Sequence, residues 1–118
     1  MQPDALARFH AALGSEIRLR IVELVASLGE MCVCELVDEL GMSQANVSRH
    51  VAILRDAGIL SARKVGTWVL LRVDEAALDR GLSTLSDGVR AALAIAPEED
   101  AEERMARRCA SRDGREVS

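Results

Sequence analysis

The chain has 118 residues, of which 49% are hydrophobic, 29% are charged and only 2% are aromatic. This length suits one domain with a modest core, and an aliphatic, aromatic-poor composition is typical of a mainly helical protein. No apolar run approaches the ~20 residues needed to cross a bilayer, and the first residues lack the basic-then-apolar order of an export signal. We therefore expect a cytoplasmic protein with no membrane partner, in a compartment where thiols stay reduced.

The net charge of -4 hides an uneven distribution. Residues 43–72 contain five basic side chains and one acidic side chain, whereas acidic residues collect in the segment 97–103. Because salt screens charges beyond about 10 Å, a local basic patch can attract phosphates even on an acidic protein. The overall charge therefore does not exclude a nucleic-acid partner.

Two helices are predicted at the start of the chain. Within residues 4–13, apolar residues recur at helical spacing, namely Leu6, Phe9 and Leu13. Ser15 follows Gly14 and is suited to cap a second helix over residues 16–28. The apolar stripe of this second helix consists of Ile17, Ile21, Leu24 and Leu28.

A helix-turn-helix is predicted next. A short helix over roughly residues 32–40 stops at Gly41, and Ser43 is suited to cap a second helix that Gly58 closes. The inward face of this second helix carries Val47, Val51 and Leu54.

Extended segments then precede a last long helix. The stretches 59–65 and 67–73 are rich in β-branched and aliphatic residues and meet at Gly66, which predicts a β-hairpin. Asp74 is suited to cap the last helix, and Pro97 ends its pattern. The apolar stripe of this helix consists of Leu78, Leu82, Leu85, Val89 and Leu93. In the charged tail beyond Pro97, opposite charges at i,i+4 spacing favour a helix, while the composition is equally compatible with disorder.

This order of elements is that of a winged helix-turn-helix, mainly α with a small β-hairpin (α+β). We assign residues 1–96 to this DNA-binding and dimerisation domain, and residues 97–118 to a charged C-terminal tail that carries Cys109. The apolar stripes of the first and last helices exceed what one small domain buries. We therefore expect a homodimer, whose symmetry would place two helix-turn-helix units on palindromic double-stranded DNA.

The helix that begins after Ser43 is the candidate for the major groove, and Ser43 itself is counted among the expected DNA contacts. Gln44, Ser48 and Arg49 point outward, and these residue types hydrogen-bond base edges. Asn46 and His50 lie at the sides of this face, within reach of phosphates. The plain alternative is an ordinary solvated helix face.

The tip of the hairpin is the second candidate for DNA contact. Arg63, Lys64 and Thr67 suit phosphate or minor-groove contact, although an ordinary charged turn would look the same. Trp68 is expected in the core, because one tryptophan in so aromatic-poor a chain gives no basis for stacking on single strands.

Two of the three cysteines, Cys32 and Cys34, lie one residue apart in "MCVCEL". In an α-helix, residues i and i+2 point ~200° apart, whereas in an extended segment they share a face. A regular helix therefore cannot bind one ion through both thiols. Either Cys32 precedes the first helical turn, or ion binding unwinds that turn. The remaining alternative is a pair of small, inert residues on an apolar stretch.

The segments "LGSEIRLRIVELV", "MCVCELVDELGMSQANVSRHVAILRDAGIL" and "ARKVGTWVLLRVD" together resemble the ArsR/SmtB family of metal-responsive bacterial repressors. The resemblance covers residues ~4–94 in order. It implies a winged-helix homodimer that binds operator DNA and leaves it when an effector ion binds.

Within that family, "CVC" followed by an acidic residue and Leu implies sensing of arsenite, As(III), or antimonite, Sb(III), which favour three sulfur ligands. A third cysteine often follows three residues after the second, and here that position is Val37. Only Cys109 remains to complete a set with Cys32 and Cys34; otherwise water or another small ligand completes a two-thiolate site. The family's zinc site on the last helix uses histidines, and residues 75–94 contain none.

Two alternatives remain for the effector. One is a divalent soft metal such as cadmium, lead or zinc, held by the cysteine pair and an acidic neighbour such as Glu35. The other is thiol oxidation, with Cys109 forming a disulfide to one of the pair. An enzyme is not expected, because the sequence has no C-x-x-C, no phosphate-binding Gly-rich loop and no nucleophile–base–orienter set.

Overall fold

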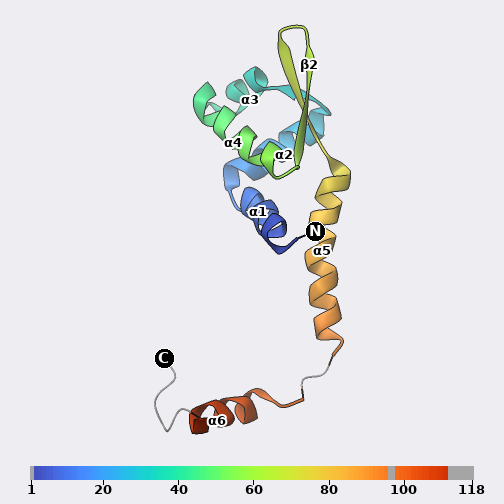
Figure 1. Cartoon of the computed structure of the whole chain (residues 1–118). Helices are drawn as coiled ribbons and strands as arrows, with labels where there is room; N and C mark the ends of the chain where they lie inside the picture. The colour runs from blue at the N-terminus through green and yellow to red at the C-terminus, as the bar shows by residue number, and fades with distance from the viewer. Residues whose placement is uncertain (1, 96–97, 112–118) are drawn as a thin grey trace. The chain divides into compact units, whose positions relative to one another are not determined.

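The computed structural model describes residues 2–95 and 98–111, without the side chains of residues 109 and 111. The elements are α1 (Pro3–Leu13), α2 (Glu16–Leu28), β1 (Met31–Cys32), α3 (Val33–Leu40), α4 (Gln44–Asp56), β2 (Leu60–Val65), β3 (Trp68–Val73), α5 (Glu75–Leu93) and α6 (Ala101–Ser111). This order, shown in Figure 1, confirms the predicted winged helix-turn-helix. Of the described residues, 2–87 form one compact unit and those from 88 to 111 form a second.

The predicted helix starts are confirmed by hydrogen bonds. Each capping side chain accepts one from an amide in the first turn: Ser15 from Arg18, Ser43 from Asn46, and Asp74 from Ala77. Between α3 and α4, Gly41 adopts φ 63°, a left-handed conformation that a residue with a side chain rarely takes. These local signals fix the turn of the helix-turn-helix.

The sheet has one strand more than the predicted hairpin. The antiparallel order is β1-β3-β2, with Met31 opposite Leu71 and Cys32 opposite Leu70. Within the hairpin, the register runs from Leu60–Val73 to Val65–Trp68. The predicted start of α3 at residue 32 is therefore corrected, because Cys32 ends a strand and α3 begins at Val33.

The core of the first unit lies between the helices and the sheet. Its fully buried members are Phe9, Ile21, Val25, Met31, Leu36, Val47, Leu54, Ile59 and Leu71. The stripe predicted for α2 is confirmed at Ile21, whereas Leu28 at the end of the helix is 61% exposed. In Figure 1 the β2–β3 hairpin extends past α3 and α4, so its tip stands clear of the core.

In the second unit, α6 confirms the helical alternative for residues 101–111. Asp100 caps the helix by accepting a hydrogen bond from the Glu103 amide at 2.8 Å, and Arg107 pairs with Glu99. None of the helices in the described ranges has the length and apolar character needed to cross a lipid bilayer.

Candidate nucleic-acid interface and thiol site

The outward face of α4 is exposed as predicted. Gln44, Asn46, Ser48 and Arg49 all lie on the surface, while Val47, Val51 and Leu54 are buried on the opposite side. Packing against the core therefore fixes which side of α4 faces outward. This arrangement leaves the predicted reading face free for contact with bases.

A hydrogen bond orients the arginine of this face. Arg49 Nη1 donates to Asn46 Oδ1 at 3.2 Å, one helical turn earlier. Asn46, predicted to reach phosphates, thus holds the guanidinium of Arg49 in the free protein. Holding a long side chain in place reduces the entropy that it loses when it binds.

His50, also predicted to face DNA, is partly buried and contacts Arg18. Arg18 Nη1 lies 3.1 Å from His50 Nδ1, and because arginine only donates, Nδ1 accepts this bond. The same guanidinium donates to the carbonyls of Ala12 at 2.7 Å and Ala11 at 3.2 Å, at the end of α1. Arg18 therefore joins α1, α2 and α4, a role that no local sequence signal indicated.

The contact with Arg18 predicts a pH dependence of stability. Burial, followed by the positive charges of Arg18 and Arg49, lowers the pKa of His50 below its ordinary 6.5. Because the unfolded chain then takes up this proton first, the stabilising contribution is present above pH 6.5 and is lost as the pH falls through the folded-state pKa. We expect the free energy of unfolding to fall between pH 7 and pH 5 in urea titrations at fixed protein concentration. In His50→Gln this fall should be smaller; an unchanged pH slope would contradict the assignment.

At the hairpin, the three predicted DNA contacts differ in their availability. Lys64 and Thr67 are exposed, whereas Arg63 donates two hydrogen bonds to the carboxylate of Glu30, from Nε and from Nη2, at 2.7 Å each. This bond lowers the pKa of Glu30 and raises that of Arg63. Arg63 must leave Glu30 before it can bind a phosphate, so Lys64 and Thr67 are the more available contacts.

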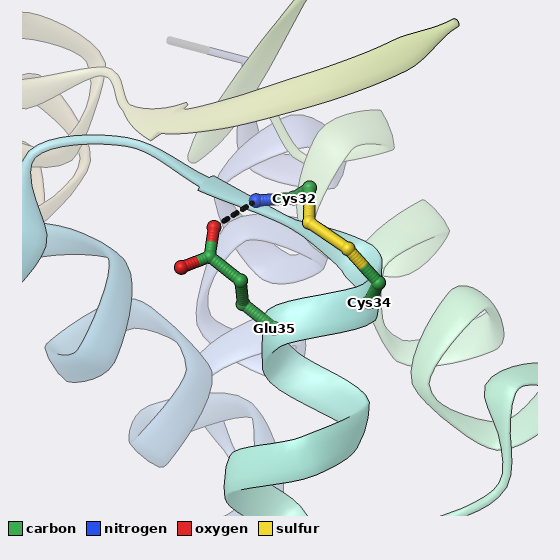
Figure 2. Close-up of a disulfide and its surroundings, with 3 residues drawn as sticks. All are labelled: Cys32, Cys34 and Glu35. Carbon is green, nitrogen blue, oxygen red and sulfur yellow. Dashed lines mark hydrogen bonds between the residues drawn. A yellow bond between two sulfur atoms is a disulfide. The ribbon is translucent and has the colours of Figure 1, made fainter.

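The cysteine pair lies where β1 ends and α3 begins. Cys32 is the N-cap of α3 with extended backbone angles (φ -85°, ψ 161°), and Cys34 belongs to the first turn. This confirms the first of the two predicted geometries, in which Cys32 precedes the helix. Figure 2 shows the result: both sulfur atoms lie on the same side of the chain without any unwinding of α3.

In this structure the two sulfurs are joined as a disulfide, with the Cα atoms 5.3 Å apart. We expected reduced thiols, and in the oxidation alternative a disulfide to Cys109, so the observed pairing corrects both expectations. The extended conformation of Cys32 is the reason, since it directs that side chain toward Cys34. Cys32 is 8% exposed, whereas Cys34 lies on the surface.

The cysteine pair is connected both to the sheet and to the helix-turn-helix. Cys32 is paired with Leu70 of β3, and Glu35 on α3 accepts a hydrogen bond from the Cys32 amide at 3.1 Å. Cys34 belongs to α3, which packs against α4. The two sulfurs therefore link the hairpin to the helix-turn-helix.

An apolar groove of about 410 Å³ opens beside the sulfurs. We call it the thiol groove; its lining residues are Cys32, Cys34, Glu35, Val65, Trp68 and Leu70. Trp68 is 64% exposed, so its predicted place in the core is wrong. It is the first residue of β3, directly after the hairpin turn.

The donor set of the site is two sulfur atoms. Once reduced, thiolates are soft ligands that prefer soft ions, and these two share one side of the chain. Within the described residues, no group of three or more His, Cys, Asp or Glu side chains is arranged to hold a metal. The side chain of Cys109, the third predicted ligand, lies outside what the structure describes.

The sequence matches known regulators over the helix-turn-helix. A family model described as "Bacterial regulatory protein, arsR family" matches residues 15–62. A helix-turn-helix-type transcriptional regulator of Methanocaldococcus jannaschii is 48% identical over 65 residues, which are 55% of this chain and 73% of that protein. The arsenical resistance operon repressor of Escherichia coli is 51% identical over 61 residues, and the match spans only about half of each chain (52%).

Solved structures share the fold. The homodimeric winged helix-turn-helix DNA-binding domain of a possible ArsR-family regulator from Mycobacterium bovis is 29% identical, with a TM-score of 0.61 over 71% of this chain and 80% of that one. An ArsR-like transcriptional regulator from Rhodococcus is 24% identical, with a TM-score of 0.69 over 90% and 91% of the two chains. The matched helix-turn-helix and the winged fold lead to one conclusion: this chain belongs to the arsR family of bacterial regulatory proteins.

Proposed function

We propose that the protein is a homodimeric transcriptional repressor that binds palindromic operator DNA and releases it when trivalent arsenic or antimony binds Cys32 and Cys34. The α4 face and the hairpin tip contact the DNA. The observation that carries the proposal is the position of the two sulfurs, which meet at the junction between these two DNA-contacting elements. The arsenical resistance repressors among the relatives support the choice of effector.

The same junction supplies the coupling between effector and DNA. An arsenic atom held between the reduced sulfurs keeps Cys34, on α3, at a set distance from Cys32, which is paired with β3. This alters how the hairpin is placed relative to α4. An effector that binds this placement more tightly than the DNA-bound one must weaken DNA binding. The factor is the same as that by which DNA weakens binding of the effector. The helix need not unwind, in contrast to the strained first turn that the spacing alone allowed.

Exposed leucines on α5 support the dimer. Leu82 and Leu85 are 46% and 47% exposed, although leucine is among the residues most often fully buried. They follow Leu78 at helical spacing, and Leu78 packs against the core. A second copy of the chain would cover this face. The resulting dimer would present two α4 helices to one palindromic DNA site.

The deciding experiment is a gel-shift titration with the reduced protein. A duplex is first selected from random-sequence DNA by the protein itself; arsenite, antimonite, cadmium, zinc and peroxide are then added separately. Release at the lowest concentration of arsenite or antimonite is expected. Failure to select any duplex would refute DNA binding, and release by cadmium alone would refute the effector.

The disulfide favours a second candidate, a repressor that responds to thiol oxidation. Cys32 and Cys34 pair without a rearrangement of α3, so a peroxide could close the bond by taking two electrons from the thiols and forming water. The peroxide titration distinguishes this candidate, because it predicts release by peroxide even without arsenite. A divalent-metal sensor has less support, since zinc sites normally use four ligands and the described residues provide no cluster of three.

Replacing Arg49 by alanine should weaken binding to the selected duplex by roughly 1–3 kcal/mol, because a bidentate contact with guanine would be lost. Arg8→Ala makes the same change in charge on α1, where Arg8 is exposed beside Asp4, and it serves as the control. If both variants lose equal affinity at equal salt, Arg49 does not read a base.

A further inference from the structure

Another cavity of the first unit lies between the C-terminal ends of α1 and α4. It measures about 570 Å³, and its lining consists of Arg8 and two alanines of α1, Arg18 of α2, and Ile53, Asp56 and Ala57 at the end of α4. We call it the arginine pocket. It shares no lining residue with the thiol groove, so it is a site separate from the cysteine pair.

Arg18 brings to this pocket a charge that no carboxylate balances. Its guanidinium belongs to a partly buried residue and donates to the carbonyls of Ala11 and Ala12 and to the ring of His50, none of which is an anion. Within residues 2–95 and 98–111, no acidic side chain forms an ion pair with Arg18. Because a charge withdrawn from water is costly unless it is paired, this position favours a bound anion.

The same guanidinium keeps donors for such an anion. A guanidinium carries one N–H on Nε and a pair on each terminal nitrogen. The bonds to the two carbonyls and to His50 use Nε and one N–H of each terminal nitrogen. One N–H on Nη1 and one on Nη2 therefore have no partner in the described part of the chain. Paired N–H groups of a guanidinium match the two oxygens of a carboxylate.

The other charged residues of the lining leave the pocket net positive. Arg8 pairs with Asp4 at 4.0 Å, and both side chains are largely exposed, so this pair holds Arg8 only weakly. Asp56 is the one acidic residue of the lining. Two arginines against one aspartate attract an anion, and Arg8 is able to turn toward it.

The rest of the lining is apolar and leaves room for more than an inorganic ion. Ile53 is 38% exposed, and three alanines complete the wall. A dry apolar cavity of about 150 Å³ holds a benzene molecule, and the arginine pocket measures about 570 Å³. A ring or a branched chain therefore fits beside a charged group, and it would cover Ile53.

We propose that the arginine pocket binds a small organic carboxylate with an apolar body. The carboxylate accepts hydrogen bonds from the terminal nitrogens of Arg18 and from Arg8, and the apolar body lies against Ile53. Binding is non-covalent. This site goes beyond the proposed function, because its ligand contains no arsenic and contacts no thiol.

A ligand in this pocket also alters the surroundings of α4. Arg18 Nη1 lies 3.1 Å from His50 Nδ1, and His50 follows Arg49 of the outward face of α4. Burial, and after it the positive charges of Arg18 and Arg49, lowers the pKa of His50. A carboxylate bound to Arg18 offsets part of that positive charge. Occupancy should therefore raise the pKa of His50 toward its ordinary value, which gives the site a spectroscopic reporter.

The test is an NMR titration of the full-length protein with benzoate as the probe. Benzamide has the same ring without the charge, and inorganic phosphate has charge without the ring; both are titrated in parallel at equal ionic strength. Benzoate should bind at least ~tenfold more tightly than either, because each control lacks one of the two kinds of contact. The Nε–H signal of Arg18, held by the Ala12 carbonyl at 2.7 Å, should shift with benzoate.

Two exposed lining residues supply variants with opposite expected signs. Arg8→Gln should weaken benzoate binding, and Asp56→Asn should strengthen it, by roughly two- to fivefold each, as for other partly exposed charge pairs. Arg20→Gln removes the same charge from an exposed position of α2 outside this pocket and should bind benzoate like the wild type. Arg18 itself is not replaced, because it joins three helices and its loss would also weaken the fold.

Several results would overturn this inference: no shift of any signal with benzoate, equal binding of benzoate and benzamide, or equal losses in Arg8→Gln and Arg20→Gln. An unchanged pKa of His50 at saturating benzoate, read from its ring signals in a pH titration, would place the ligand elsewhere and contradict the site. Each of these results leaves the proposed function intact, since the titration involves neither DNA nor arsenic.

Discussion

Serine in place of Cys34 is expected to leave operator binding within about twofold of the wild type and to impair release by arsenite severely. Cys34 is exposed, so its replacement disturbs no core contact. A hydroxyl is a hard ligand and does not replace a thiolate on a soft ion. Since losing even an outer-shell partner commonly costs 10–100-fold in metal affinity, the arsenite needed for half release should rise by at least ~100-fold. Gel shifts with the selected duplex measure both quantities.

Cys34 is the better of the two positions for this test. Cys32 is only 8% exposed and belongs to β1, so serine there would bury a hydroxyl and could weaken the fold as well as the site. The oxidised wild type is the matched control, because its sulfurs are bonded to each other and cannot bind arsenic until they are reduced. If Cys34→Ser releases the duplex at the same arsenite concentration as the wild type, the proposal that Cys34 senses arsenic is wrong.

The same substitution at Cys109 tests the third ligand. If the tail delivers its sulfur to the pair, Cys109→Ser should require more arsenite for release. A wild-type response would mean that the arsenic atom is completed by two thiolates and a non-protein ligand.

Local signals in the sequence predicted most of the fold. Caps at Ser15, Ser43 and Asp74 and the break at Gly41 depend on residues within one helical turn, so they can be recognised without tertiary contacts. The missing element was β1. Two residues are too few to show the alternation of a strand, and its pairing partner lies about forty positions away on β3.

The candidate site was predictable where it depended on exposure and not where it depended on distant pairs. An outward face on α4 follows from the buried positions Val47 and Val51. The contacts of Arg18 with His50 and of Arg63 with Glu30 join residues 32 and 33 positions apart. No periodicity encodes such pairs, and the fold alone brings them together.

Trp68 illustrates a wrong inference from residue type. Its size suggested the core, yet Trp68 begins β3 directly after the hairpin turn and is 64% exposed. The exposure of a side chain at the end of a strand depends on the tertiary packing around it, which the sequence of the strand does not reveal. The exposed ring becomes informative only beside the sulfurs, in the thiol groove.

Gly81→Ala is expected to destabilise the protein, because overpacking a core usually costs about 1–3 kcal/mol. Gly81 lies on α5 directly against the ring of Phe9 on α1, and a Cβ atom there would overlap the far edge of that ring. Phe9 is 1% exposed and is enclosed by the core, so its ring cannot move aside without disturbing its neighbours. The gain in helix propensity on going from glycine to alanine, about 1 kcal/mol, offsets only part of this cost.

Gly88 provides the control for this prediction. It lies on the same helix, and a Cβ atom there would meet nothing within 4 Å, so Gly88→Ala should show the gain in propensity alone. Urea denaturation at fixed protein concentration measures both variants, which should shift in opposite directions. A double-mutant cycle then identifies the cause: Phe9→Leu shortens the side chain that faces Gly81, so adding Gly81→Ala to it should cost much less than in the wild type. If the effects of the two substitutions on the free energy of unfolding are simply additive, the close packing of α1 on α5 is not the reason why position 81 needs glycine.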